Sequence, residues 1–239
     1  MSDIEIVELS EIPIKKRTVV TGFAGAGFIS NTALMYAARA KGFKQVGHLH
    51  GNMMPAMMIL VEGKPRHSFR IYTDASDDLM FLVTESMLSA ESTWAIGQGL
   101  MTWLKKKGLK EIVAFEGFPF AQKGIYGFTT GDKNLQGYGI QPITEGAIQG
   151  VNAALLDEAM KEGVEWTTIF VPTRLISGID YQGVVDAIQV LNTMFKLDVD
   201  AEELRRMSEA ITRATASHQK QQQKRGSFLN RILPGETDP

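Results

Sequence analysis

Residues 18–40 read TVVTGFAGAGFISNTALMYAARA, and this stretch decides the fold class. Thr18–Thr21 is rich in β-branched residues and predicts a buried strand, whereas Ile29–Ala40 predicts a helix that Gly42 ends. The glycine-rich turn between them allows positive φ angles and a close approach of the backbone to the next helix. A strand, a glycine turn and a helix in succession indicate an α/β protein.

The same alternation continues on both sides of this stretch. Glu62-Gly63-Lys64-Pro65 predicts a hairpin turn that makes the sheet mixed. We predict strands at Ile4–Leu9, Gln45–His50, Met57–Val61, Ser68–Tyr72, Leu79–Thr84, Glu111–Phe115, Ile125–Thr130 and Trp166–Val171, and helices at Thr93–Lys107, Ala147–Glu162, Tyr181–Phe195 and Ala201–Ser217. The sequence therefore predicts a three-layer αβα fold with a mixed, mostly parallel sheet and a C-terminal helical extension.

The composition is that of a globular protein: the chain has 239 residues, of which 44% are hydrophobic and 22% charged. We expect one α/β domain over residues 1–217, which includes the C-terminal helices, and a flexible Gln/Lys-rich tail over residues 218–239. Because the chain has no cysteine, disulfides, thiolate catalysis and cysteine-based metal sites are excluded. No metal site is predicted from its four histidines.

Charge and hydropathy narrow the range of partners. A net charge of −2 weighs against a nucleic-acid binder, and we interpret the basic segment Lys220 to Arg231 as a solvated tail rather than an RNA contact. The longest apolar stretch, Met53–Val61, is far too short to span a bilayer, and the first residues show no secretion signal. We therefore expect a cytoplasmic protein that contacts neither membrane nor nucleic acid.

The glycine turn almost fits two nucleotide-binding templates. Gly22 and Gly27 have the spacing of a triphosphate-binding loop, but Phe28 and Ile29 stand where that loop needs lysine and Ser/Thr. A dinucleotide site would also need an acidic residue about 20 positions further on, and none is there. No cofactor is therefore expected, and the turn indicates either tight packing or binding of a phosphate or other small anion.

A small-molecule site at this turn is one functional hypothesis. The expected ligand is a nucleoside, a phosphate ester or phosphate, held at the N-terminus of the helix. The residues assigned to this site are Gly22, Gly25, Gly27, Asn31, His48 and Glu116. Structural roles explain each of them as well, and no complete catalytic motif is present. We therefore assign no catalytic residue and favour a protein that is not an enzyme.

Methionine and phenylalanine gather in loops rich in glycine and proline. Such residues either fill the core or form an adaptable protein-binding surface. We predict the partner-binding residues Met53, Met54, Phe118 and Phe120.

Four segments follow one another in a characteristic order. They are TGFAGAGFISNTA at residues 21–33, MMP at residues 53–55, GAIQGVNAALL at residues 146–156 and DYQGVVDA at residues 180–187. Their order and spacing resemble the archaeal and bacterial family named after the second proteasome-assembly chaperone. The resemblance covers residues 5–215.

This resemblance implies a fold akin to purine nucleoside phosphorylases and peptidyl-tRNA hydrolases. It also implies a homo-oligomer, trimer to pentamer, and a role in assembling the proteasome core particle through its α-subunits. Relatives with that role carry a C-terminal tripeptide of the form hydrophobic-Tyr-any, whereas this chain reads Thr237-Asp238-Pro239. The favoured function is a non-catalytic assembly or interaction protein, and the alternative is a small-molecule enzyme or sensor that uses the Gly22–Gly27 turn.

Overall fold

The structure is a computed structural model that describes residues 4–119, 124–173, 175 and 178–214. Phe120, the predicted tail over residues 218–239 and the end of the predicted last helix lie outside the described residues.

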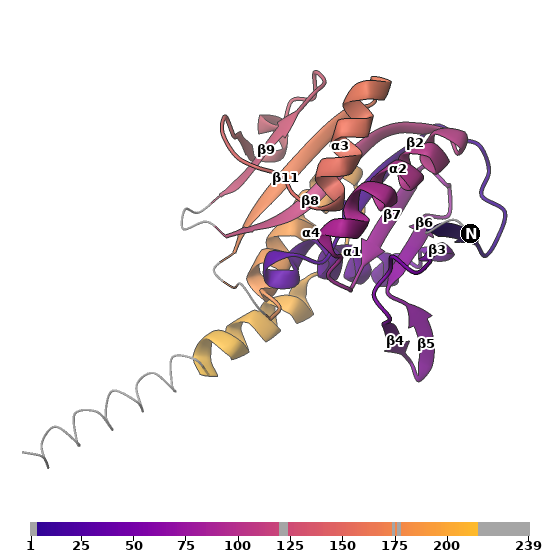
Figure 1. Cartoon of the computed structure of the whole chain (residues 1–239). Coiled ribbons are helices and arrows are strands. Elements are labelled where there is room, and N and C mark those ends of the chain that lie inside the picture. Colours follow the sequence, from indigo (N-terminus) through magenta and orange to yellow (C-terminus); the bar gives the residue numbers. More distant parts are fainter. Residues whose placement is uncertain (1–3, 120–123, 174, 176–177, 215–239) are drawn as a thin grey trace, which may run out of the picture.

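A nine-stranded mixed sheet forms the centre of the molecule (Figure 1). Its strands lie in the order β1-β3-β6-β7-β2-β8-β11-β9-β10. The four central strands β7, β2, β8 and β11 run parallel, whereas β1, β3 and β6 pair antiparallel on one side and β9 pairs antiparallel with β11 on the other. The strand bounds are β1 Glu5–Glu8, β2 Arg17–Gly22, β3 Lys44–His50, β6 Phe69–Thr73, β7 Leu79–Thr84, β8 Leu109–Pro119, β9 Ile125–Thr129, β10 Ile140–Pro142 and β11 Glu165–Thr173.

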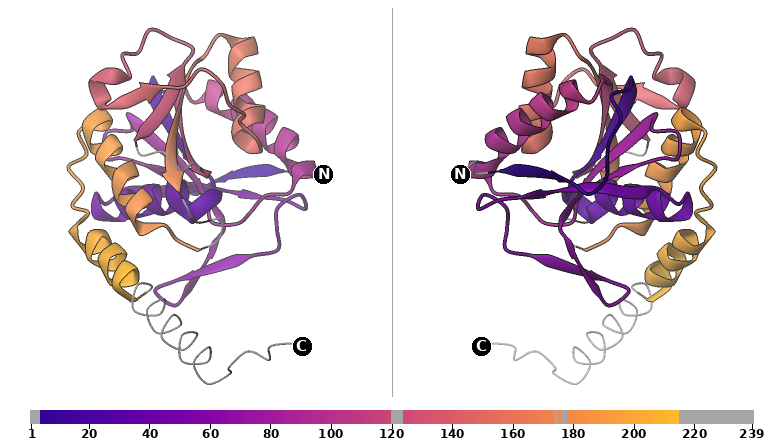
Figure 2. Two further views of the ribbon diagram at one scale, coloured as in Figure 1. Left: turned by 90° about the vertical axis from the view of Figure 1, so that its left-hand side faces the viewer. Right: turned by 90° about the vertical axis from the view of Figure 1, so that its right-hand side faces the viewer.

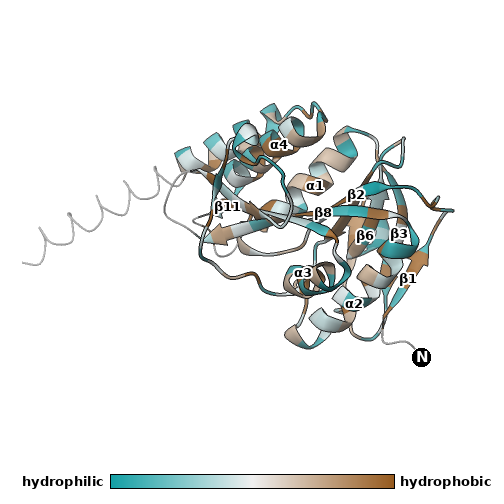
Figure 3. Cartoon of the chain, turned by 90° about the horizontal axis from the view of Figure 1, so that it is seen from above, coloured by the Kyte–Doolittle hydropathy of each residue, from teal (hydrophilic) through white to brown (hydrophobic). Residues whose placement is uncertain are grey.

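Two pairs of helices cover the two faces of this sheet. Seen from above, α1 (Ile29–Ala40) and α4 (Tyr181–Phe195) lie on one side, and α2 (Ala90–Lys106) and α3 (Val151–Glu162) lie on the other (Figure 3). Short 3-10 helices span Ala26–Phe28 and Gln136–Tyr138. The predicted three-layer α/β fold is confirmed, and residues 202–214 form a further helix after α4.

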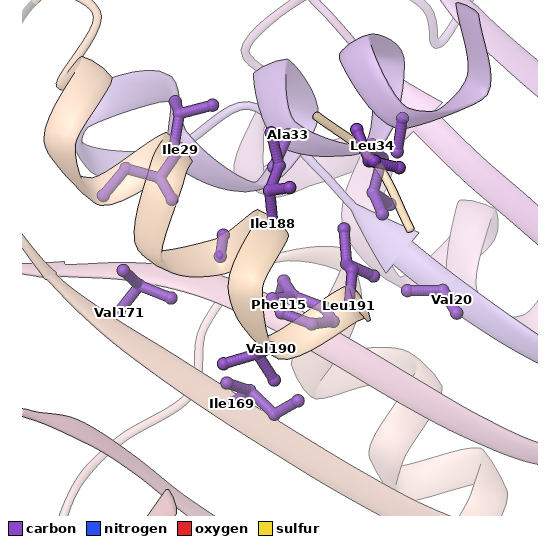
Figure 4. Close-up of a cluster of buried hydrophobic side chains, with 14 of the residues drawn as sticks. Val20, Ile29, Ala33, Leu34, Phe115, Ile169, Val171, Ile188, Val190 and Leu191 are labelled. Atoms are coloured by element: carbon purple, nitrogen blue, oxygen red, sulfur yellow. The ribbon is translucent and has the colours of Figure 1, made fainter. Parts of the chain in front are cut away.

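Each face of the sheet has its own apolar core. On the α1–α4 face, Ile29 and Leu34 of α1 pack against Ile188 and Leu191 of α4 over the central strands (Figure 4). On the α2–α3 face the largest buried side chain is Trp166, whose indole N–H donates to the Thr168 hydroxyl at 2.7 Å. The hydrogen bond satisfies the polar edge of a ring that water cannot reach.

The predicted hairpin forms with a different second strand. Strand β4 (Met58–Val61) pairs with β5 (Lys64–His67) as a separate two-stranded sheet. The predicted strand Ser68–Tyr72 forms as β6, one residue further on, but it pairs within the main sheet and not with β4. Glu62 and Gly63 both have positive φ, so this two-residue turn reverses the chain at once. The hairpin therefore does not make the main sheet mixed. We call residues 57–67 the arm, because they project from the body (Figure 2).

Two helices begin elsewhere than predicted. Helix α3 begins at Val151 and not at Ala147, because Gly150 has a φ of 72° that a helix cannot continue through. Helix α2 begins at Ala90, three residues before the predicted Thr93. The segment before α3 is thereby left as an extended loop that lies beside the helix.

Helices α2 and α3 approach each other closely at one glycine. A Cβ atom on Gly97 would lie 2.6 Å from the Cβ of Ala154, whereas a Cβ on Gly99 would meet no heavy atom within 4 Å. Both glycines belong to α2, so alanine improves the intrinsic helix propensity equally at the two positions.

Gly97→Ala should therefore lower the free energy of unfolding by about 1–2 kcal/mol, because the overpacking cost exceeds the propensity gain. Gly99→Ala is the matched control and should raise it by up to about 1 kcal/mol. Urea denaturation followed by circular dichroism measures both values. Equal effects of the two substitutions would contradict the close helix contact.

Candidate functional site

The glycine turn after β2 is packed against protein atoms. Gly27 has a φ of 64°, and a Cβ there would lie 2.7 Å from the Thr173 hydroxyl. A Cβ on Gly22 would lie 2.7 Å from the carbonyl oxygen of Ser30. The Asp180 N–H donates to the Gly27 carbonyl at 2.9 Å and ties the turn to the start of α4. Packing accounts for Gly22 and Gly27, and the ligand role assigned to them stays a prediction.

The first turn of α1 buries two polar side chains. The Ser30 hydroxyl donates to the carbonyl oxygen of Phe23 at 2.8 Å. Asn31 is 4% exposed, and its side-chain oxygen has no hydrogen-bond partner among the described residues. Gly25 is less confined, since the nearest atom to a Cβ there is 3.9 Å away.

His48 and Glu116 lie on opposite faces of the sheet. His48 of β3 is the cross-strand neighbour of Arg70, whose guanidinium lies 3.7 Å from the sulfur of Met35 in α1. Glu116 of β8 instead contacts Asn152 of α3. The six residues assigned to the small-molecule site therefore do not converge on one pocket.

His48 stacks on His67, the last residue of the arm. Their ring centroids are 3.7 Å apart and the ring planes differ by 5°, while His50 meets His67 edge-on at 6.0 Å. Burial, together with the neighbouring imidazoles, lowers the pKa of His48, and burial and His50 lower that of His67. In the part of the chain that the structure describes, no three His, Cys, Asp or Glu side chains are arranged to hold a metal ion.

A polar network crosses the α2–α3 face of the sheet. The Thr21 hydroxyl donates to the side-chain oxygen of Asn152 at 2.8 Å, and the Asn152 amide donates to the Glu116 carboxyl at 2.5 Å. Thr21 and Asn152 are fully buried and Glu116 is half-buried. Burial raises the pKa of Glu116 to about 7 although the Asn152 hydrogen bond opposes the rise, so the carboxyl holds a proton part of the time near neutral pH.

Sequence reasoning missed Asn152 in this network. The signal was present as an asparagine in the first turn of an otherwise apolar helix, within the segment GVNAALL at residues 150–156. A buried amide at such a position needs partners, and Thr21 and Glu116 at the ends of β2 and β8 supply them.

The predicted partner-binding residues lie in two separate places. Met53 and Met54 follow β3 at the base of the arm, and Met54 packs against the α2–α3 core. Phe118 lies near the end of β8, where its ring meets that of Phe170 at 5.5 Å. Three strands, β6, β7 and β2, separate β3 from β8. A partner role for these residues stays a prediction.

Two apolar surfaces lie beyond the four predicted partner-binding residues. On the arm, Met57, Met58 and Leu60 are 45%, 52% and 73% exposed. The second surface is a groove of about 510 Å³ beside α3, which we call the α3 groove. Its lining comprises Phe128, Ile143, Thr144, Glu145, Gly146, Ala147, Ile148, Ala153, Leu156, Asp157, Met160 and Phe170.

Glu116→Gln should flatten the pH dependence of stability. The native state keeps a proton on Glu116 that the unfolded chain releases above its ordinary pKa of 4.5, so this residue destabilises the fold as pH rises from 4.5 to about 7. As pH rises from 4.5 to about 7, the free energy of unfolding of the variant should rise by on the order of 2 kcal/mol relative to that of the wild-type chain. Urea denaturation at each pH measures the difference, with the exposed Glu11→Gln as the control. Parallel curves for Glu116→Gln and wild type would contradict the assignment.

The histidine stack should make the fold weaker in acid. A histidine with a lowered folded-state pKa stabilises the protein above its unfolded pKa of about 6.5, and this contribution is lost as pH falls through the folded value. Thermal unfolding should therefore show a melting temperature that drops below about pH 6.5 in the wild type and drops less in His67→Gln. The melting temperature of each protein is compared with its own value at higher pH, where its imidazoles are neutral. A drop of the same size in both proteins would exclude the stack as its cause.

Among the described residues, every helix is too short or too polar to cross a bilayer.

Known proteins resemble this chain over almost its whole length. The Pyrococcus furiosus protein PbaA, described as an archaeal homologue of a proteasome-assembly chaperone, is 21% identical with a TM-score of 0.79, over 96% of this chain and 97% of that one. A Thermoplasma acidophilum protein of unknown function is 25% identical with a TM-score of 0.71, over 89% and 91%. An uncharacterised Methanocaldococcus jannaschii protein is 21% identical over 88% of this chain and 89% of its own length.

A family model agrees with these likenesses. The PAC2 family model matches residues 19–219, which include the glycine turn, helices α1 to α4 and the Thr21–Asn152–Glu116 network. The resemblance seen in the sequence is thereby confirmed. This chain belongs to the PAC2 family.

Proposed function

We propose that the chain is a non-catalytic, cytoplasmic assembly factor that associates with itself and binds proteasome α-subunits. Membership of the PAC2 family, with a fold like that of PbaA over 96% of the chain, is the observation that carries this proposal. PbaA is described as a homologue of a proteasome-assembly chaperone, and PbaB of the same organism, with a TM-score of 0.78, as a proteasome activator.

The surface of the molecule supports a binding role. Met57, Met58 and Leu60 expose apolar side chains on a two-stranded hairpin, and such a hairpin is only marginally stable by itself. Apolar side chains gathered on a projecting element are typical of protein contacts. This arrangement favours self-association, for which we propose a trimer to pentamer.

The half-exposed residues Met53 and Phe118 remain our candidates for the contact with the α-subunit. A flexible thioether and an aromatic ring near the surface can adapt to a partner. The alternative of a ligand at the glycine turn is less favoured, because the packing of Gly22 and Gly27 needs no ligand to explain these residues.

Purified chain mixed with α-subunits of its own host should form a complex in native mass spectrometry. It should also shorten the lag before peptidase activity appears when β-subunits are added. Met53→Ser should weaken the complex about tenfold, the loss of an average interface contact of roughly 1.4 kcal/mol. Met87→Ser, at a residue that is 61% exposed, is the control and should leave binding unchanged. Absence of any complex at about 10 µM of each protein would overturn the proposal.

A further inference from the structure

The arm presents an apolar face and two unpaired positive charges. Residues directly opposite each other in the hairpin share a face, so Met58 and Leu60 lie together with Pro65, which stands opposite Leu60. His67 stands opposite Met58 at the base of this face, where it stacks on His48. Lys64 and Arg66 lie on the other face and are exposed. Neither forms an ion pair with any residue that the structure describes.

The rim of the α3 groove carries negative charge, opposite to the positive charge of the arm. Its interior is apolar, and its volume of about 510 Å³ is in the range of pockets that enclose a small ligand or a few side chains. Glu145 and Asp157 are the charged residues among its lining, which contains no lysine or arginine. Asp157 pairs with the neighbouring Lys161 at 2.5 Å, whereas Glu145 is exposed and has no ion pair within the described part of the chain.

The arm and the elements that wall the α3 groove lie at opposite ends of the molecule. In Figures 1 and 2, which differ by a turn about the vertical axis, the arm lies at the lower end, and α3 and β9, which wall the groove, lie at the upper end. The arm cannot reach the groove of its own subunit. A contact between the two surfaces must join two subunits.

We propose that the arm of one subunit docks in the α3 groove of a second copy of this chain. Met58 and Leu60 fill the apolar interior. Lys64 and Arg66 begin on the other face of the two-stranded hairpin, and their long side chains extend past its free edge to the acidic rim at Glu145 and Asp157. Opposite charges at the edge of an apolar contact favour the correct register and exclude a meeting of two grooves or two arms.

Because the two surfaces differ, the contact is head-to-tail. Each subunit uses its arm toward one neighbour and its groove toward the other, and such an interface closes into a ring when the rotation between subunits allows it. The inference rests on the self-association in the proposed function and adds the surfaces that produce it.

Charge reversal tests the pairing. The arm variant Lys64→Glu/Arg66→Glu and the groove variant Glu145→Lys/Asp157→Lys should each raise the dissociation constant of the oligomer at least tenfold in analytical ultracentrifugation. An equimolar mixture of the two variants should assemble again, because each reversed surface then meets an opposite charge. All these positions are exposed or partly exposed, so the monomer fold should persist, and circular dichroism checks this for each variant.

Cross-linking tests the contact itself. Since the chain has no cysteine, Leu60→Cys/Met160→Cys introduces two thiols, one on the arm and one on the groove. Mild oxidation should give a ladder of covalent oligomers on a non-reducing gel. Leu60→Cys/Met87→Cys, with its second thiol at another exposed site outside the groove lining, is the control and should give no ladder.

A wild-type chain that is monomeric at about 10 µM would overturn this inference together with the self-association in the proposed function. Any one of three results would overturn the arm contact alone. The oligomer could survive both charge reversals, the cysteine variant could form no ladder, or the oligomer could fall apart when residues 215–239 are removed. Binding to α-subunits is measured separately, so its failure would leave the arm contact standing.

Discussion

The close contact between the glycine turn and strand β8 is the constraint on which the rest of the fold depends. The carbonyl oxygen of Ala26 lies where a Cβ on Gly117 would stand, only 1.9 Å from that position, so any side chain at Gly117 would push the turn away. Gly27 is confined in the same way, because a Cβ there would lie 2.7 Å from the Thr173 hydroxyl. These contacts press the start of α1 against the parallel centre of the sheet, and α4 then packs on α1 to complete that face.

The two faces of the sheet are built differently. The α1–α4 face is closed by aliphatic and aromatic side chains and buries Arg70 against Met35 of α1. The α2–α3 face instead holds Thr21, Asn152 and Glu116 in a hydrogen-bonded chain. That chain fixes the first turn of α3 to β2 and β8. Since the same helix forms a wall of the α3 groove, the network positions a surface that self-association would use.

The sequence predicted the fold where local signals and tertiary packing agree. The strand and helix around the glycine turn were correct, because β-branched residues, glycines and a regular apolar helix face all indicate the same arrangement. The predicted second strand of the hairpin was wrong because the turn at Glu62-Gly63 is followed directly by β5, with no loop between them. The α3 groove could not be predicted, since it arises from the placement of residues 143–148 beside α3, which no periodic pattern encodes.

The outer strands of the sheet limit how copies of the chain can join. Strand β1 begins and ends with glutamate, and β10 has three residues and ends with Pro142, which has no N–H to donate. Such borders resist the addition of a further strand from another molecule. A continuous sheet through several subunits, the arrangement that also leads to fibrous aggregates, is therefore disfavoured, and contacts between copies of this chain would form through side chains.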